Sequence, residues 1–196
     1  MIKPRISHAV EPARVVKASG AGYGKLGTVR IYKRERWTRR GVNRAKLNPM
    51  GKITRITVHH SGSPKGFADT DYKATVSYLE KVRSYHRSRK WADIGYHYAV
   101  DPKGRVWECR DIKYQGAHVR NHNEHNIGVV LLGNFEIQKP TWSQLSSMKK
   151  LVKQLRAKYR VGVKRIYTHK EINPTTCPGR HLQPVVSLYR RNGFFL

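Results

Sequence analysis

The chain has 196 residues, of which 40 are Lys or Arg and 12 are Asp or Glu, giving a formal net charge of +28 and a pI near 10.6. This length predicts one domain with at most a short appendage, and it suffices to bury a substantial core. Two cysteines are too few for a disulfide framework. No apolar run reaches the roughly 18 residues of a membrane span. The few acidic residues offer no motif for a glycosidase, which needs two suitably spaced carboxylates.

Taken in chain order, the sequence predicts a basic segment followed by alternating strands and helices. Residues 1–50 are basic and punctuated by glycine, as a flexible arm would be. Strands are expected at residues 53–60, 96–100, 105–108, 126–132 and 163–169, and helices after an N-cap within 69–71, after a capping box at Thr141, and over 184–189. Strands separated by helices predict an α/β domain over residues 51–196, with a mixed central β-sheet flanked by helices.

Two of the predicted strands end in histidine, and a turn-rich loop with a cysteine follows the second. The run 53–60 ends in His59 and His60, the run 163–169 ends in His169, and Cys177 lies in the loop 173–179. Zinc accepts imidazole nitrogen and thiolate sulfur, and three protein ligands leave a fourth position for water, whose pKa falls to roughly 7. The pattern favours a catalytic zinc site of two histidines and one cysteine that hydrolyses an amide or an ester.

Spacing alone leaves other interpretations open. His59 also fits a half-buried strand residue, and Cys177 a small core thiol. A rival metal cluster would join His118, His122 and His125, although their Asn-rich surroundings are more typical of a solvated loop. Cys109, the other cysteine, is expected to be an inert thiol.

A series of short motifs between about Ile53 and Gly179 resembles a known family. In order, they are Val58-His59-His60-Ser61, Trp91-Ala92-Asp93-Ile94-Gly95-Tyr96-His97-Tyr98, Asp101-Pro102-Lys103-Gly104-Arg105-Val106-Trp107-Glu108, Gly116-Ala117-His118, Asn123-Glu124-His125-Asn126-Ile127-Gly128-Val129, and Thr168-His169 with Cys177-Pro178-Gly179. The ordered set resembles the zinc-dependent N-acetylmuramoyl-L-alanine amidases, which include phage lysozyme-type amidases and peptidoglycan recognition proteins. The resemblance implies their fold and a Zn²⁺ cofactor, and near Trp37 it implies order from about Val29.

The resemblance also assigns the metal ligands. It implies His59, His169 and Cys177 as the zinc ligands, with His60 a neighbour of the metal. Adjacent strand side chains point to opposite faces, so His59 and His60 are not expected to reach one ion together. Alternation does not say which of the two binds, and the resemblance decides for His59.

Further roles follow from the same resemblance. Tyr96 matches a catalytic tyrosine, and Thr175 stands where phage amidases often carry lysine and recognition-protein amidases carry threonine, so the resemblance implies that both are catalytic. Some members carry a glutamate at the position of Val130, and its absence leaves proton transfer to zinc-bound hydroxide and Tyr96. The residues expected to bind substrate are His60, His118 and Asn123.

The expected function is hydrolysis of the amide bond between N-acetylmuramic acid and L-alanine of the peptidoglycan stem peptide. The alternative is a recognition module that binds peptidoglycan without cutting it, although such proteins commonly lose the cysteine ligand. The charge runs through the whole chain and attracts polyanions. No nucleic-acid-binding motif accompanies it, and the amidase resemblance then favours anionic envelope polymers or an outer-membrane surface over a specific nucleic acid.

The biological setting is expected to be that of a phage endolysin or another bacteriolytic enzyme. The first residues carry no continuous apolar core and do not resemble a secretory signal. We therefore expect a monomer that is made in the cytoplasm and acts on the cell wall, in the periplasm or outside the cell.

Overall fold

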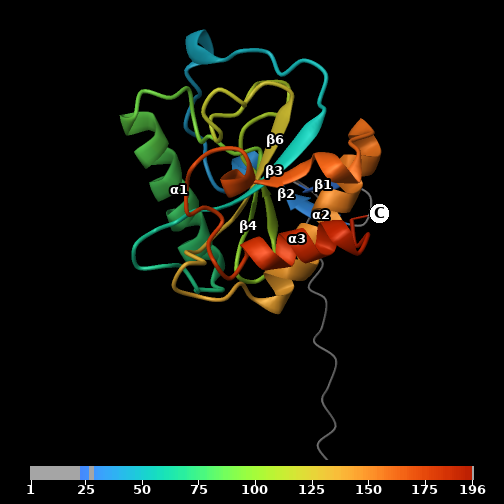
Figure 1. The fold of residues 1–196 in the computed structure, drawn as a ribbon. Helices are drawn as coiled ribbons and strands as arrows, with labels where there is room; N and C mark the ends of the chain where they lie inside the picture. Colours follow the sequence, from blue (N-terminus) through green and yellow to red (C-terminus); the bar gives the residue numbers. More distant parts are fainter. Residues whose placement is uncertain (1–22, 27–28, 196) are drawn as a thin grey trace, which may run out of the picture.

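The computed structural model describes residues 23–26 and 29–195 and shows a mixed β-sheet of seven strands between helices (Figure 1). In spatial order the strands are β1 (Tyr23–Leu26), β2 (Val29–Tyr32), β5 (Val106–Glu108), β4 (Tyr98–Val100), β6 (Asn126–Leu131), β3 (Arg55–His60) and β7 (Ile166–Thr168). The α-helices of this part of the chain are α1 (Tyr72–Ser88), α2 (Trp142–Tyr159) and α3 (Gln183–Arg191). The predicted fold class, a mixed sheet flanked by helices, is confirmed.

Four neighbouring strands, β4, β6, β3 and β7, run parallel to one another, whereas β5 is antiparallel to β4. Strand β6 is buried along its whole length, as its continuous apolar run predicted. In the register of β3 with β6, His59 lies opposite Val130. The candidate metal ligand on β3 therefore lies near the carboxyl end of a strand that pairs with β6 on one side and with β7 on the other.

The sheet separates two hydrophobic cores. On one face, Ile56 and Val58 of β3 pack with buried side chains of α2 and α3. On the other face, Val130 and Trp107 pack with Leu79 of α1 (Figure 1). Because side chains alternate along a strand, Thr57 and His59 point to the α1 face, where the site described below lies.

Local sequence signals explain where the two long helices begin. The Asp71 carboxylate accepts a hydrogen bond of 2.9 Å from the Ala74 amide and caps α1. At the start of α2, Thr141 and Gln144 form the predicted capping box, with bonds of 3.0 Å in both directions. These bonds satisfy amide groups that the first helical turn leaves without partners.

The predicted strand 163–169 is shorter in the structure than in the prediction. Residues Val163–Arg165 form a 3₁₀ turn, η3, and the strand covers only Ile166–Thr168. His169 opens a second 3₁₀ turn, η4 (His169–Glu171). The imidazole is therefore placed by the turn that follows the strand.

The segment before β3 packs on the domain through polar contacts. Strand β2 pairs with β5, and between β2 and β3 lie two short 3₁₀ turns, η1 (Arg34–Arg36) and η2 (Arg44–Lys46). The fully buried Asp93 carboxylate contacts the guanidinium groups of Arg34 at 2.8 Å and of Arg83 at 2.7 Å. The predicted basic segment 1–50 also includes residues 1–22 and 27–28, which lie outside the described residues.

In the described part of the chain, no helix combines the length and apolarity needed to cross a membrane.

Candidate active site

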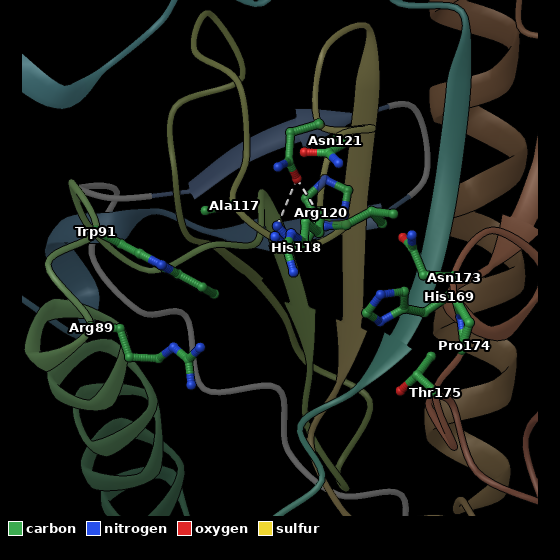
Figure 2. Close-up of a pocket in the computed structure, with 12 residues that line it drawn as sticks. Arg89, Trp91, Ala117, His118, Arg120, Asn121, His169, Asn173, Pro174 and Thr175 are labelled. Atoms are coloured by element: carbon green, nitrogen blue, oxygen red, sulfur yellow. Dashed lines mark hydrogen bonds between the residues drawn. The ribbon is translucent and has the colours of Figure 1, made fainter.

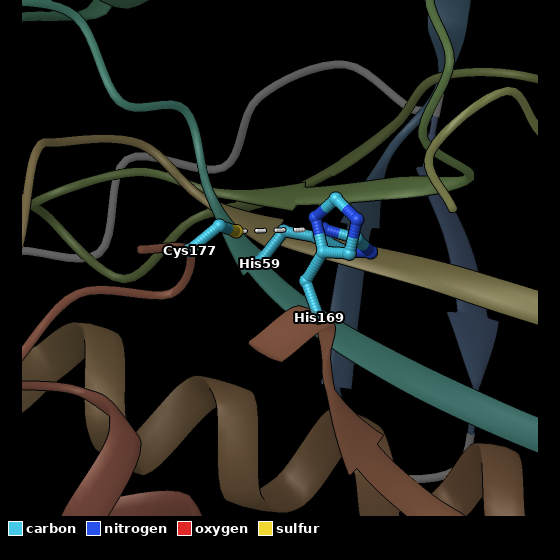
Figure 3. Close-up of side chains that lie close together, drawn as sticks. All are labelled: His59, His169 and Cys177. Carbon is cyan, nitrogen blue, oxygen red and sulfur yellow. Dashed lines mark hydrogen bonds between the residues drawn. The ribbon is translucent and has the colours of Figure 1, made fainter. Parts of the chain in front are cut away.

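Two histidines and a cysteine converge on the α1 face of the sheet. The potential ligand atoms of His59, His169 and Cys177 all lie within 4.8 Å of one another, and Cys177 Sγ is 3.6 Å from His59 Nδ1 (Figure 3). In a tetrahedral zinc site with bonds of about 2.3 Å to sulfur and 2.0–2.1 Å to nitrogen, those two atoms lie about 3.6 Å apart. The donor types and this spacing fit a zinc ion.

Each donor is held by a different kind of segment. His59 lies on the buried strand β3, and His169 lies at the first position of η4. The Cys177 loop is tied down by its backbone, since the Cys177 carbonyl accepts a bond of 2.9 Å from Lys170 N, and the His60 amide donates to Cys177 Sγ at 3.4 Å. The cysteine is thus bound both to the turn that carries His169 and to the strand that carries His59.

Burial sets the protonation of the three donors in the absence of a cation. Desolvation lowers the pKa of His59 well below its ordinary value and also lowers that of His169, so both imidazoles are neutral at pH 7. Desolvation raises the pKa of the Cys177 thiol to about 12, although the amide of His60 opposes the shift. A divalent cation would offset the cost of a buried thiolate, because metal binding displaces the thiol proton.

Tyr96 and Thr175, the two predicted catalytic residues, lie beside this group. The Tyr96 ring centroid is 5.3 Å from that of His59, and burial raises the pKa of its hydroxyl, which stays protonated as a donor. Tyr96 precedes β4 by two residues, so it is not on the central strand as expected. The Thr175 hydroxyl accepts a bond of 3.2 Å from the Cys177 amide and thus also shapes the loop.

A groove borders the candidate metal site through His169, the one of the three donors that lines it. It comprises two hollows of about 900 and 660 Å³ that share Arg89, Trp91, Ala117, His118 and His169. Figure 2 shows Arg89 and Trp91 on one side, His118 between, and His169 with Thr175 on the other. The described residues that line the hollows include the cations Lys81, Arg89 and Arg120 but no acidic side chain. The groove therefore favours an anionic ligand.

The three residues predicted to bind substrate take different positions. His118 and Asn123 line the larger hollow, but the Asn123 side-chain oxygen accepts bonds from the His118 and Val119 amides at 2.7 and 2.9 Å. His60 lines neither hollow, because strand alternation turns its ring to the other face of β3, where Nδ1 accepts a bond of 3.1 Å from Phe135 N. This geometry gives no support to substrate contact by His60.

The alternatives that spacing left open have a clear outcome. Among the described residues, His59, His169 and Cys177 form the one group of three or more donors with metal-binding spacing, and the rival set of His118, His122 and His125 forms none. Cys109 is fully buried, and desolvation raises the pKa of its thiol, as befits an inert core residue.

Sequence reasoning missed part of the groove wall. Arg89 is the C-cap of α1, and Arg120 lies in the loop between β5 and β6. Both are single arginines in a chain with 40 basic residues, so no sequence signal distinguishes them. Trp91 begins one of the family-like motifs, which was the available signal for this side of the groove.

Together the fold and site define a class: a mixed-sheet α/β domain whose candidate His-His-Cys metal centre borders a cation-lined groove. Comparison with known proteins agrees with this class and narrows it. Residues 49–180 match the family described as N-acetylmuramoyl-L-alanine amidase. The chain belongs to this family.

Individual relatives have different described roles. The chain is 30% identical over 159 residues to peptidoglycan-recognition protein SC2 of Drosophila melanogaster, which covers 80% of this chain and 84% of the relative. It is 32% identical over 110 residues to the endolysin of Escherichia phage T7, covering 54% of this chain and 72% of the endolysin. The crystal structure of Drosophila peptidoglycan recognition protein SD superposes with a TM-score of 0.74 at 25% identity, covering 81% of this chain and 94% of that one.

Proposed function

We propose that this protein is a zinc-dependent N-acetylmuramoyl-L-alanine amidase that cuts peptidoglycan between N-acetylmuramic acid and the L-alanine of the stem peptide. The observation that carries the proposal is the convergence of His59, His169 and Cys177 within 4.8 Å at the edge of a groove. The proposed reaction is inferred from membership of the amidase family, and peptidoglycan as the substrate is inferred from the names of the relatives.

In this proposal the three metal-binding residues, Tyr96 and Thr175 have different roles. A zinc ion held by the three donors would act as a Lewis acid on a carbonyl oxygen and lower the pKa of water. The protonated Tyr96 hydroxyl donates a hydrogen bond to the oxygen on which negative charge develops, a contribution typically worth about 10²–10³ in rate. Thr175 lines the groove with a hydroxyl that holds the Cys177 loop and carries no charge.

The groove fits the acidic part of the proposed substrate. The side chains of Arg89 and Arg120 line it, and no acidic residue among the described lining residues opposes them. Guanidinium groups bind carboxylates through paired hydrogen bonds, so these arginines are suited to the carboxylates of a stem peptide.

The test uses purified peptidoglycan and the zinc-loaded full-length chain. We expect soluble stem peptides with a free L-alanine amine, identified by mass spectrometry, and no product after dialysis against chelator. Cys177→Ser should abolish release, while Cys109→Ala, which removes the other buried thiol, should retain it. Full activity in chelator, or in the folded Cys177→Ser protein, would refute the metal mechanism.

A second candidate function is peptidoglycan recognition without cleavage. The similarity to recognition proteins favours it. Val130 also favours it, because this residue lies opposite His59 at the position where a glutamate could act as a general base, and valine cannot take up a proton. Sedimentation with insoluble peptidoglycan, with no release of amine by the zinc-loaded protein, would select this function over hydrolysis.

We further propose that the protein is a phage endolysin or another bacteriolytic enzyme, and the similarity to the phage T7 endolysin supports this proposal. In this setting residues 1–50 are a basic segment joined to a catalytic domain at 51–196, and the chain acts as a monomer on the cell wall. The net charge of +28 attracts anionic envelope polymers or an outer-membrane surface. Cosedimentation with peptidoglycan carrying or lacking its anionic polymers, over a series of salt concentrations, tests this attraction.

A further inference from the structure

His118 makes a hydrogen-bonded bridge between a metal-binding histidine and the sheet. Its Nδ1 lies 3.0 Å from His59 Nε2, and its Nε2 lies 3.1 Å from the backbone oxygen of Asn126. The rings of His59 and His118 meet edge to face at an interplanar angle of 81°. His118 is buried, so this bridge crosses the interior beneath the groove.

The hydrogen bond to the Asn126 carbonyl determines which ring nitrogen carries the proton in His118 and in His59. A carbonyl oxygen only accepts hydrogen bonds, so His118 Nε2 must carry the proton and donate. A neutral imidazole has one N–H, and the buried His118 ring is bonded to an imidazole and a carbonyl with no carboxylate partner, so its Nδ1 accepts. His59 must then donate from Nε2, which leaves Nδ1 unprotonated. This is the nitrogen that lies 3.6 Å from Cys177 Sγ.

The surroundings of His118 leave its ring little freedom. A Cβ on Gly116 would lie 2.8 Å from His118 Nε2, and one on Gly128 would lie 2.6 Å from its Cδ2. Both distances are shorter than contacts between real side chains, so the ring fills the space left by two glycines. The His118 amide is held at 2.7 Å by Asn123. The backbone at these positions thus restricts where the imidazole ring can lie.

The residue that supplies the carbonyl is fixed as well. The Asn126 side chain accepts a bond of 2.9 Å from the Thr57 hydroxyl and donates one of 2.8 Å to the His122 carbonyl. Asn126 also opens β6, which pairs with β3. The strand that carries His59 and the strand that orients its imidazole are therefore locked in register.

We propose that His118 is a positioning residue that holds His59 in the Nε2-protonated tautomer, so that His59 presents Nδ1 to the metal. It touches neither the metal nor the scissile bond in this role, and its effect passes through His59. The inference rests on the proposed zinc site but not on amide hydrolysis. Partners of this kind, which orient a metal-binding histidine, typically change metal affinity by about 10- to 100-fold when removed.

The first experiment reads the tautomers directly, by long-range ¹H–¹⁵N correlation spectra of the histidine rings in the full-length protein. We expect both His59 and His118 to carry their proton on Nε2 without metal, and added zinc to shift the Nδ1 resonance of His59. A proton on His59 Nδ1, or a zinc-dependent shift of its Nε2 instead, would overturn the proposal. This measurement needs no variant and does not depend on activity.

The second experiment measures zinc affinity by competition with a chromophoric chelator. His118→Leu removes the acceptor and should weaken zinc binding by about 10- to 100-fold. His118→Asn places an amide oxygen near the position of Nδ1 and should restore most of the affinity. His97→Leu is the matched control, because His97 is equally buried and bonded to the Tyr114 carbonyl and Gly128 amide but is not bonded to a proposed ligand.

The outcomes separate this proposal from the proposed function. Equal zinc affinity in wild type and His118→Leu, or an equal loss in His97→Leu, would reduce His118 to an ordinary buried residue and overturn the inference alone. A wild-type chain that binds no zinc would overturn the inference together with the zinc amidase. Tight zinc binding with the expected tautomers but no amine release would leave the inference standing and refute the amidase.

Discussion

Substituting Gly128 of β6 by alanine adds one methyl group and tests how closely the His118 ring is packed. In Gly128→Ala the new Cβ would lie 2.6, 2.7 and 2.8 Å from three atoms of the His118 ring, whereas unbonded carbons rest about 3.5–4.0 Å apart. The ring must therefore move by about 1 Å. A shift of that size would distort the 3.0 Å bond between His118 and His59.

Overpacking of this kind costs about 1–3 kcal/mol, which corresponds to roughly 2–12 °C in Tm for a domain of this size. Urea unfolding of the metal-free protein and its Tm measure the loss, and zinc competition measures the effect on His59. Gly162→Ala is the control, since its added Cβ meets only Arg165, at 3.9 Å, and its φ of −62° suits alanine. If Gly128→Ala is as stable as Gly162→Ala, the close packing deduced around His118 is wrong.

Three further predictions concern acid stability, catalysis and the buried ion pairs. Burial lowers the pKa of His97 from 6.5 to about 4, so below pH 6.5 only the unfolded chain gains this proton. The contribution of His97 to stability should then fall by about 3 kcal/mol between pH 6.5 and 4, and urea unfolding of His97→Leu should show a loss of stability over this range that is smaller by about this amount. Tyr96→Phe should lower kcat by about 10²–10³ with unchanged zinc affinity, and a loss below about tenfold would argue against its role as a donor. Asp93→Asn leaves the buried Arg83 and the half-buried Arg34 without their carboxylate and should cost about 3–5 kcal/mol in thermal or urea unfolding, whereas Asp111→Asn, at an exposed ion pair, should cost at most about 1 kcal/mol.

The sequence predicted the parts of the fold that local patterns encode. The capping box at Thr141 and the continuous apolar run of β6 are local signals, and both correspond to elements in the structure. The run 163–169 has the composition of a strand, yet only its last part pairs with β3, and Val163–Arg165 turn as a 3₁₀ helix. Pairing depends on the neighbouring strand, which composition does not describe.

The candidate site divides in the same way between local and distant information. Ordered motifs predicted the grouping of His59, His169 and Cys177, and alternation predicted that His59 and His60 would point to opposite faces of the strand. The bond between His118 and His59 joins residues 59 positions apart and depends on two glycines that leave room for a ring. No local pattern reports such a contact, so the sequence suggested substrate binding for His118, which stays a prediction, but did not suggest its bridge to a proposed metal ligand.

The order of the donors along the chain has a consequence for biosynthesis. Cys177 Sγ contacts a histidine 118 positions earlier, and the loop that carries it also binds the turn of His169. A growing polypeptide can form β3 and β6 long before position 177 has left the ribosome, yet it holds only part of the donor set until then. The proposed enzyme would therefore lack its complete donor set, and with it its activity, until residue 177 has been synthesised and has packed against β3.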